Sequence, residues 1–344
     1  MKKFIISVIH SGYNHVPETA ESWHKNFSKD AALAYVNSNI NKTLAYIGKA
    51  GQAGCDIVCT HEDFTNAGHY VRDFKFPGLF ADLVKNIQDS LQQRLSGLAK
   101  QHSMLVAANH YEDCDGLIYN MSTMYGRNGE VLGKYKKVHL ADSENWKATA
   151  GEVFNVIATD MGNIGFCTCY DMIFPETCRM LAINGADIII HQTQGWGTGH
   201  KASPPVGEAY MRVRAAENSV YLIVSKNIQG DGSDGGRSVI LDNNGEIVAE
   251  SEVTVESILT VEVEPNFDLI APYCFNNYFA GVPGCKGRMF MARKPSLYGA
   301  LTSADTAVSE KFKDYKLGYT AKDGEAAMNN WTQKPEEEKR LYYW

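Results

Sequence analysis

The strongest constraint on the fold is a succession of apolar patterns that runs along the chain twice. In its first passage, short apolar runs predict buried strands, and apolar residues at three- and four-residue spacing predict amphipathic helices. Asn128-Gly129 between two β-rich runs is a strong turn signal, so a hairpin closes this passage. The predicted elements are a strand at 4–9, a helix at about 30–50, a strand at 56–60, a helix at 81–102, a strand at 104–108 and the hairpin at 117–136.

The second passage has much the same order and begins with a pair of strands. The predicted elements are strands at 153–157 and 164–168, a helix at about 175–185, a strand at 187–191, a helix at 206–218, a strand at 220–225, a hairpin with arms at 238–241 and 247–250, and a strand at 258–263. Strands that alternate with helices favour layers of sheet and helix. We therefore predict an α/β fold, a four-layer α-β-β-α sandwich of two mixed β-sheets with helices on the outer faces.

The regular patterns end near residue 265, which divides the chain into two predicted parts. Residues 1–265 form the domain. Residues 266–344 carry several Gly, Pro and aromatic residues and one modest helical candidate at about 303–315. Because residues 341–344 are unusually apolar for a chain end, we predict that this C-terminal extension packs on the domain or on a partner subunit.

Composition and charge restrict the partners. The 344 residues carry a formal net charge of −7 and are 44% hydrophobic, so we expect a small-molecule ligand, no nucleic acid and no membrane. No window approaches the length of a membrane span. The eight cysteines form no C-x-x-C pair and no disulfide-like framework, which predicts reduced thiols and a cytoplasmic location. The histidines lack the spacing of zinc sites, so no metal is expected.

One cysteine lies where a predicted strand gives way to a helix. The run at 164–168 ends at Cys169, and Pro175 with Glu176 opens the next helical pattern. A sharp turn of this kind exposes a nucleophile and directs the free N–H groups of the helix toward it, which lowers a thiol pKa and offers donors to an oxyanion. The alternative is a buried structural cysteine, the commoner role of a free cysteine.

Two more reactive side chains follow predicted strands. Glu62 comes after the strand at 56–60, and Lys137 comes after the second arm of the first hairpin. Sites in α/β sheets gather at the carboxyl ends of strands, so we expect both to meet Cys169. A carboxylate can take the thiol proton, and an ammonium group can stabilise a thiolate and an oxyanion. The alternatives are a solvated loop acid and an exposed basic pair, Lys136 and Lys137.

The segments around these residues resemble the catalytic segments of the nitrilase superfamily of carbon–nitrogen hydrolases. They are HEDF at 61–64, GKYKKVHL at 133–140 and GFCTCYDMIFPE at 165–176, and they occur in the family's order at similar separations. Flanking stretches at 54–58, 184–190, 212–227 and 235–250 extend the resemblance over roughly residues 4–264. Three such segments in order are far more specific than any one of them.

The resemblance implies a role for each matching residue. It makes Cys169 the nucleophile, Glu62 the general base and Lys137 the lysine that stabilises the oxyanion. The family has a second active-site glutamate shortly after the lysine, and Glu144 is the best match, with Glu152 as the alternative.

Three further interpretations concern the surroundings of Cys169. The backbone N–H of Tyr170 would complete the oxyanion hole. Cys167 is the competing thiol, but the family nucleophile precedes an aromatic or polar residue and then an acid, as Cys169 does. Trp196, in a Gly-rich loop at 194–200, lines the substrate pocket or, alternatively, anchors its own loop.

The activity that the resemblance implies is cofactor-free hydrolysis of a small linear amide or N-carbamoyl compound through a thioester, with release of ammonia or an amine. Nitrilases of the superfamily usually carry Trp-Glu after the nucleophile, whereas this chain has Tyr170-Asp171, so nitrile hydrolysis is an alternative. A catalytically silent interaction scaffold is another. Family members are commonly dimers with C-terminal tails crossing the partner, so the resemblance also implies a homodimer or a higher homo-oligomer.

Overall fold

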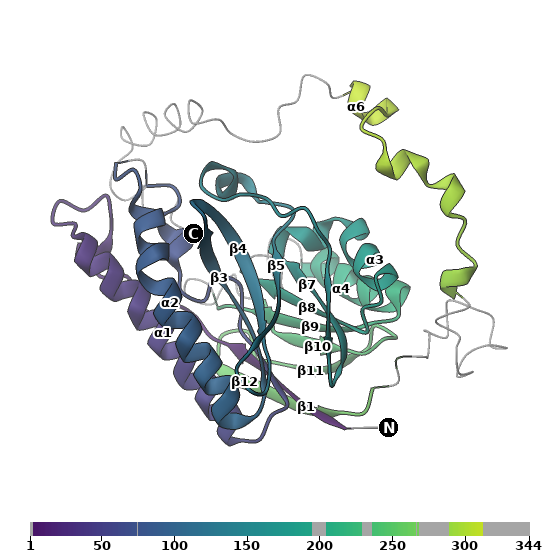
Figure 1. The fold of residues 1–344 in the computed structure, drawn as a ribbon, viewed down its shortest axis with the longest axis horizontal. Coiled ribbons are helices and arrows are strands. Elements are labelled where there is room, and N and C mark those ends of the chain that lie inside the picture. Colours follow the sequence, from purple (N-terminus) through teal and green to yellow (C-terminus); the bar gives the residue numbers. More distant parts are fainter. Residues whose placement is uncertain are drawn as a thin grey trace.

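Two six-stranded sheets face each other in the computed structural model, which describes residues 3–73, 75–194, 204–228, 236–265, 267 and 289–311 (Figure 1). The first sheet has the order β12 (Ser257–Val263), β1 (Phe4–His10), β2 (Ile57–Cys59), β3 (Leu105–Cys114), β4 (Leu117–Tyr125) and β5 (Val131–Lys136). The second has the order β11 (Ile247–Glu250), β10 (Val239–Leu241), β9 (Tyr221–Lys226), β8 (Ile188–Thr193), β7 (Gly162–Thr168) and β6 (Val156–Thr159).

Both sheets are mixed, and they are built alike. In the first sheet β1, β2 and β3 are parallel and β3, β4 and β5 are antiparallel neighbours, while β12 adds an antiparallel edge. In the second, β7, β8 and β9 are parallel, β9, β10 and β11 are antiparallel, and β6 adds the antiparallel edge. The repeated order of apolar patterns in the sequence therefore corresponds to two sheets of the same design.

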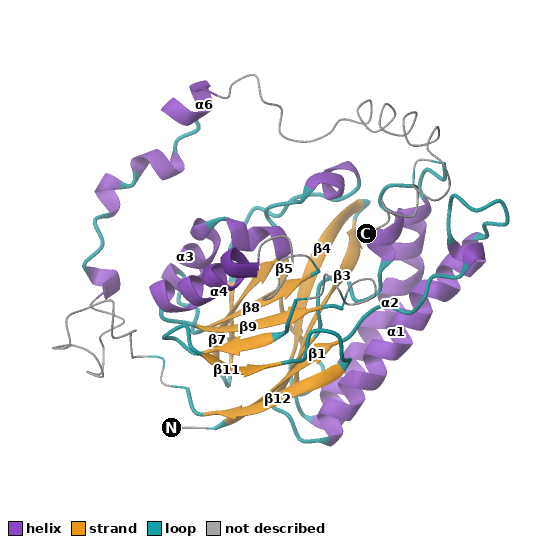
Figure 2. Ribbon diagram, turned by 180° about the vertical axis from the view of Figure 1, so that it is seen from behind, coloured by secondary structure: helices purple, strands orange, loops and turns teal. Residues whose placement is uncertain are grey.

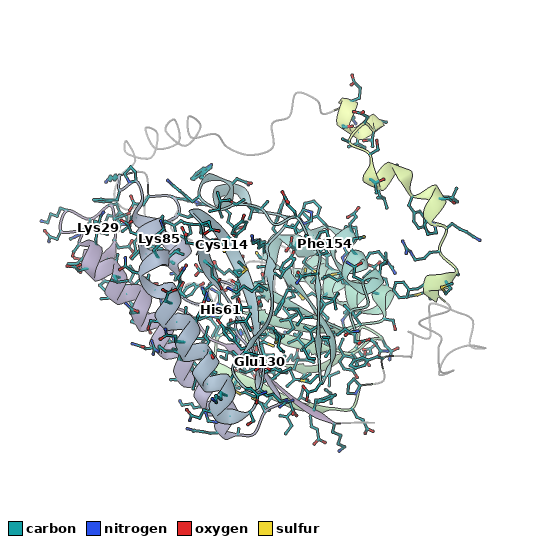
Figure 3. All side chains as sticks on the ribbon, in the orientation of Figure 1. Lys29, His61, Lys85, Cys114, Glu130 and Phe154 are labelled. Atoms are coloured by element: carbon teal, nitrogen blue, oxygen red, sulfur yellow. The ribbon has the colours of Figure 1, made fainter. Side chains whose placement is uncertain are left out.

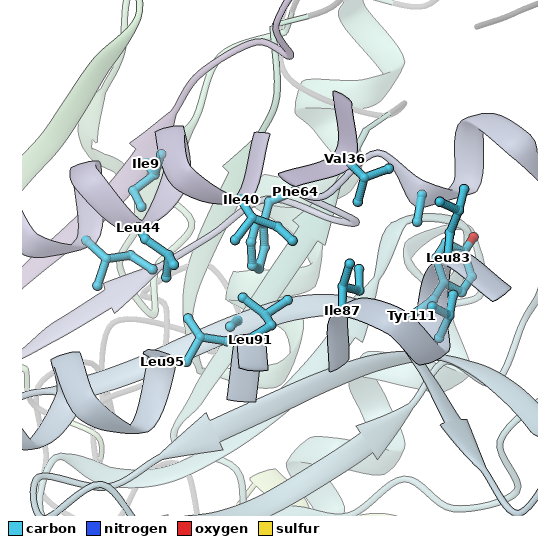
Figure 4. Close-up of a cluster of buried hydrophobic side chains, with 14 of the residues drawn as sticks. Ile9, Val36, Ile40, Leu44, Phe64, Leu83, Ile87, Leu91, Leu95 and Tyr111 are labelled. Carbon is cyan, nitrogen blue, oxygen red and sulfur yellow. The ribbon is translucent and has the colours of Figure 1, made fainter. Parts of the chain in front are cut away.

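Helices cover the outer face of each sheet, as Figure 2 shows. The first sheet is covered by α1 (Lys29–Gln52) and α2 (Leu79–His102), and the second by α3 (Pro175–Ile183) and α4 (Pro204–Asn218). Figure 4 shows the apolar cluster of α1, α2 and the first sheet, which includes Ile9 of β1, and in which Ile40 and Leu91 lie near Phe64 of the loop after β2. A second apolar cluster lies between the sheets, and a third lies between the second sheet and its helices. These three interfaces confirm the four-layer α-β-β-α sandwich.

Local sequence signals set several element boundaries. The side chain of Ser28 accepts a hydrogen bond from the N–H of Ala31 and caps α1. Pro175 occupies the first turn of α3, where its missing N–H is not needed. The helix α2 ends at Ser103, which has a left-handed backbone with φ of 51°.

The first sheet differs from the prediction at one hairpin. The strand expected at 104–108 continues to Cys114, turns through Asp115 and Gly116, which have φ of 56° and 88°, and pairs with β4 along its whole length. The polar residues at 109–113 conceal this strand because they do not form an apolar run: Asn109 and Tyr111 hydrogen-bond in the site described below, whereas Glu112 and Asp113 pair with lysines elsewhere. We return to this hairpin below, since it carries part of the site.

Smaller differences occur elsewhere. The strand expected at 153–157 lies at Val156–Thr159. A 3₁₀ helix, η4 (Cys169–Ile173), lies between β7 and α3. The helical candidate at 303–315 corresponds to the short α6 (Ala307–Lys311), which follows the 3₁₀ turns η6 (Pro295–Leu297) and η7 (Gly299–Thr302). Among the helices that the structure describes, none is long and apolar enough to cross a membrane.

Candidate active site

The three reactive residues singled out in the sequence follow the carboxyl ends of three strands. Glu62 lies in the loop after β2, Lys137 directly follows β5 in the same sheet, and Cys169 directly follows β7 in the facing sheet. In Figure 3, His61, which precedes Glu62, lies in the middle of the molecule. Lys137 and Cys169 follow Glu62 by 75 and 107 positions in the sequence, and the stacking of the two sheets brings all three to one buried place.

The Lys137 ammonium lies between two carboxylates. Its Nζ donates to Glu62 Oε1 at 2.8 Å and to Glu144 Oε2 at 2.5 Å, and the Lys137 side chain is 1% exposed. Burial by itself lowers the pKa of Lys137, but the charges of Glu144 and Glu62 outweigh it and raise this pKa well above its usual value. Lys137 is therefore a buried cation. Its burial excludes the alternative that Lys136 and Lys137 form an exposed basic pair.

Glu144 is held as an anion. Its Oε1 accepts from the Tyr111 hydroxyl at 2.9 Å and from Asn120 Nδ2 at 2.8 Å, and its Oε2 accepts from Lys137 and from the N–H of Ala141 at 2.9 Å. Although burial by itself raises the pKa of this carboxyl, the Lys137 charge and these hydrogen bonds outweigh burial and lower it. Glu152, the alternative match, is exposed.

Glu62 retains one open acceptor position. Its Oε1 accepts from Lys137 and from Asn120 Nδ2 at 2.9 Å, and its Oε2 accepts from the N–H of Gln194 at 3.1 Å. A carboxylate offers about four acceptor positions. Among the described residues, three positions are used at Glu62, whereas all four are used at Glu144. The hydrogen-bond inventory thus favours Glu62 Oε2 as the oxygen that can take a proton.

Cys169 lies on a strained turn beside these charges. It has a left-handed backbone with φ of 46°, which is uncommon for a residue with a side chain. The turn expected from the sequence is present, but its expected effect on the thiol is wrong. Burial and the Glu62 charge raise the pKa of Cys169 to about 11, although Lys137 and a hydrogen bond with Thr193 act in the opposite direction. The resting thiol is neutral and needs a base.

One buried carboxylate ties the Cys169 turn to the Lys137 loop. Asp171 Oδ2 accepts from the N–H of Thr168 at 3.0 Å and from the Tyr135 hydroxyl at 2.7 Å. Asp171 Oδ1 accepts two hydrogen bonds from His139, one from its backbone N–H at 2.9 Å and one from its ring nitrogen Nδ1 at 2.8 Å. Thr168 precedes Cys169 and His139 lies two residues after Lys137, so Asp171 fixes Cys169 relative to Lys137.

The remaining sequence interpretations have different outcomes. Tyr170 is the second residue of η4, where the first N–H groups of a helix lack partners within the helix, so its role as an oxyanion donor stays a prediction. Cys167 points to the opposite side of β7, into the cluster under α3, where it is fully buried. Trp196 lies outside the described residues.

A cavity of about 340 Å³ lies next to the Glu144 side of the site. Residues from 70–81, 116–118 and 146–149 form its wall. Trp146 follows Glu144 by two residues, and the ring of Phe80 in the same wall lies 4.9 Å from that of Tyr111. None of Glu62, Lys137 and Cys169 lines this cavity.

Several residues of the site escaped the sequence analysis. Tyr111, Asn120 and Gln194 donate hydrogen bonds to the two glutamates, yet none of them belongs to the three motifs. The polar run at 109–113 was the available signal for Tyr111. In the described ranges, no group of His, Cys, Asp and Glu residues is arranged to hold a metal ion.

Comparisons with known proteins identify the family of this chain. A sequence model described as carbon-nitrogen hydrolase matches residues 32–267. Omega-amidase NIT2 of Mus musculus is 25% identical over 242 residues, which cover 66% of this chain and 83% of that protein. A citrullinase of Francisella tularensis is 26% identical over 236 residues, with coverages of 64% and 82%.

Solved structures show the same fold. A carbon-nitrogen hydrolase from Helicobacter pylori has a TM-score of 0.67 at 20% identity, covering 87% of this chain and 98% of that one. An amidase from Nesterenkonia gives a TM-score of 0.64 at 18% identity, with coverages of 87% and 97%. The family match spans well over half of the chain, and we conclude that this protein belongs to the carbon–nitrogen hydrolases of the nitrilase superfamily.

Proposed function

We propose that this chain hydrolyses the carbon–nitrogen bond of a small linear amide or N-carbamoyl compound, with Cys169 as the nucleophile. The observation that carries the proposal is the buried Lys137 ammonium, paired with Glu62 and Glu144 next to a strained cysteine turn. A nucleophile, a base and a fixed cation are what acyl transfer through a thioester requires.

The proposed reaction has two similar halves. Glu62 takes the thiol proton while Cys169 Sγ attacks the carbonyl carbon, and Lys137 with the N–H of Tyr170 stabilises the resulting oxyanion. The intermediate collapses, the carbon–nitrogen bond breaks, and Glu62 gives its proton to the leaving nitrogen, which departs as ammonia or an amine. Water then attacks the thioester, Glu62 accepts its proton, and the acid is released as the thiol is reprotonated.

The relatives support both proposed substrate classes. The omega-amidases are named for amide hydrolysis, and one relative is a citrullinase. Citrulline carries a carbamoyl group on nitrogen, so the reacting carbonyl has a nitrogen on both sides. Both groups present a planar carbonyl to the same nucleophile, and the walls of the surrounding pocket decide between them.

Ammonia release from a panel of simple amides, N-carbamoyl amino acids, N-carbamoyl amines and nitriles tests the proposal. We expect release from an amide or an N-carbamoyl class, abolished in Cys169→Ala and retained in Cys167→Ala, whose thiol faces away from the site. Activity on nitriles alone would assign the alternative reaction. Equal activity in Cys169→Ala would contradict the proposal.

Intact-mass analysis after iodoacetamide treatment tests the silent-scaffold alternative. Iodoacetamide is itself a small amide, so a working site should bind it and alkylate Cys169 faster than the other thiols. A scaffold without chemistry should show no single fast cysteine. Loss of the fast adduct in Cys169→Ala identifies the residue.

We further propose a cytoplasmic homodimer or higher homo-oligomer in which the extension at 266–344 packs on the domain or on a partner subunit. The thiols of the described cysteines are free, which supports a reducing location. Large apolar side chains between 291 and 308 are exposed, which supports a second surface that covers them.

A further inference from the structure

We propose that Asn120 is a positioning residue that gives the two glutamates different roles, Glu62 as the proton acceptor and Glu144 as a permanent anion. By donating to both carboxylates it completes the hydrogen bonding of Glu144, and it leaves one oxygen of Glu62 open to the thiol proton. This inference rests on the proposed function, because it explains how two chemically identical side chains take different roles in that reaction.

The donor geometry is the first support. A single nitrogen, Asn120 Nδ2, lies 2.9 Å from Glu62 Oε1 and 2.8 Å from Glu144 Oε1, so its two hydrogens serve one carboxylate each. Asn120 is 1% exposed. Lys137 brings one positive charge to two carboxylates, and neutral N–H donors allow both to stay ionised without a second cation.

The orientation of the Asn120 amide is fixed by its neighbours. Asn109 Nδ2 donates to Asn120 Oδ1 at 2.9 Å and to Ser122 Oγ at 3.0 Å, while Asn109 Oδ1 accepts from the N–H of Asp63 at 2.7 Å. An inverted Asn120 amide would place its NH₂ group against another donor and its oxygen against two carboxylates. The chain of amides therefore presents the NH₂ group to Glu62 and Glu144.

The hairpin of β3 and β4 supplies this arrangement. Asn120 lies directly opposite Tyr111, and Ser122 lies opposite Asn109, so the four side chains occupy one face of the antiparallel pair. Tyr111 donates to Glu144, whereas Asn120 donates to Glu144 and Glu62. The two neighbours thus form a matched pair in which one side chain touches a single carboxylate and the other bridges both.

The bridge has a consequence for proton transfer. When Glu62 takes the thiol proton, Glu144 still has four donors and keeps its charge, so Lys137 remains an ammonium group facing the oxyanion. The Asn120 N–H groups stabilise the ionised forms of both carboxylates. Without them, each carboxylate is protonated more readily. The site should then be active only at higher pH. Asp63, the buried acid next to Glu62 whose pKa burial raises to about 7, keeps its own donors Thr65 and Gly68 in the Asn120 variants, so it does not account for a difference between them and wild type.

The pH dependence of Cys169 alkylation by iodoacetamide tests the inference without requiring the natural substrate. We expect the acidic limb of the rate profile to move upward by about one to two pH units in Asn120→Ala, the size expected for losing a hydrogen bond to a charged group. In Tyr111→Phe, which spares Glu62, we expect less than half of that shift. Asn120→Ser, which keeps one donor, should lie between wild type and Asn120→Ala, and it serves if the alanine variant does not fold.

The outcomes separate this inference from the proposed function. A uniform loss of rate at every pH, with the acidic limb in place, would mean that Asn120 is merely structural. A shift in Tyr111→Phe as large as in the Asn120 variants would place the effect on Glu144 alone and overturn the bridge. If wild-type Cys169 reacts no faster than the other thiols, the proposed function fails instead.

Discussion

At the scale of single residues, the site depends on one buried cation. Replacing Lys137 by methionine keeps much of the side-chain volume and removes the charge, so we expect kcat to fall about 100- to 1,000-fold, the cost of losing one oxyanion donor. Two buried carboxylates would also face each other, so we expect the variant to be destabilised by about 3–5 kcal/mol in urea unfolding.

Lys136 provides the control for this prediction. It is the neighbouring lysine, and its Nζ lies 3.7 Å from the centre of the Tyr119 ring rather than between carboxylates. Lys136→Met should keep nearly normal turnover. Comparable losses in the two variants would contradict the role of Lys137, as would a Lys137→Met enzyme with unchanged kcat.

The neutral resting thiol leads to a second residue-scale prediction. Burial raises the pKa of Cys169 most, and the Glu62 charge raises it further. Glu62→Gln removes that charge, so the alkaline limb of Cys169 alkylation should move to lower pH, away from the wild-type pKa of about 11. Turnover should nevertheless fall, since the proposed general base is gone. An alkaline limb that stays in place or moves upward would show that Glu62 does not act on this thiol.

Which site residues could be identified from the sequence depends on where each one lies relative to a predicted strand. Glu62, Lys137 and Cys169 were identifiable because each stands at or just beyond the end of a predicted strand within a recognisable segment. Asn120 and Tyr111 were not, because their role comes from facing each other across a hairpin, and cross-strand register is not visible in local periodicity. The raised thiol pKa was missed because burial and a neighbouring carboxylate outweigh the turn.

At the scale of elements, the site requires the β7–η4 turn and the end of β5 to keep a fixed relation. Asp171 accepts one hydrogen bond from Thr168 at the end of β7 and three from Tyr135 and His139, which lie in β5 and just beyond its end. In Asp171→Asn either orientation of the amide sets an NH₂ group against donors. We expect a loss of about 1–3 kcal/mol in urea unfolding and a fall of about 100-fold in kcat, because Cys169 shifts relative to Lys137.

Tyr135→Phe is the matched control for this junction. It removes one donor to Asp171 and leaves the bonds from Thr168 and His139 in place. The control should lose less stability and much less activity than Asp171→Asn. If Asp171→Asn loses stability and keeps its kcat, Asp171 supports the fold and does not position the nucleophile.

The elements themselves were predicted unequally. Long amphipathic helices such as α1 and α2 were recognisable because their buried faces meet an apolar sheet. The end of β3 was missed because its buried residues 109–112 are Asn, His, Tyr and Glu. Asn109 and Tyr111 serve the polar site, and Glu112 pairs with Lys134. Strand prediction from apolar runs fails where function replaces the apolar core.

At the scale of the whole molecule, the order of elements was enough to predict two sheets and four layers. The likeness of the two sheets follows from the same order of strands and helices occurring twice, with right-handed crossovers and hairpins leaving few ways to pair neighbouring strands. That the two sheets face each other across a shared core was harder to predict from the sequence. A buried strand is apolar whether it packs against a helix or against another sheet.

The C-terminal extension carries the last prediction. Figure 2 shows the segment with η6, η7 and α6 lying apart from the sandwich. It exposes Met291, Leu297, Leu301 and Val308 at 86%, 77%, 67% and 65%. Exposed apolar side chains along one segment favour a partner surface. We expect the chain of residues 1–344 to be a homo-oligomer by light scattering after size exclusion, and a chain ending at Pro265 to form a smaller species.

Point substitutions distinguish the extension's apolar contacts from a general effect of shortening the chain. Leu297→Ser with Leu301→Ser should shift the chain of residues 1–344 toward the smaller species, because serine removes the apolar surface that a partner would bury. Val153→Ser with Val255→Ser, at exposed positions on the sandwich, is the control and should leave the assembly unchanged. An oligomer that survives both the truncation and the double serine substitution would assign the subunit contact to the sandwich itself.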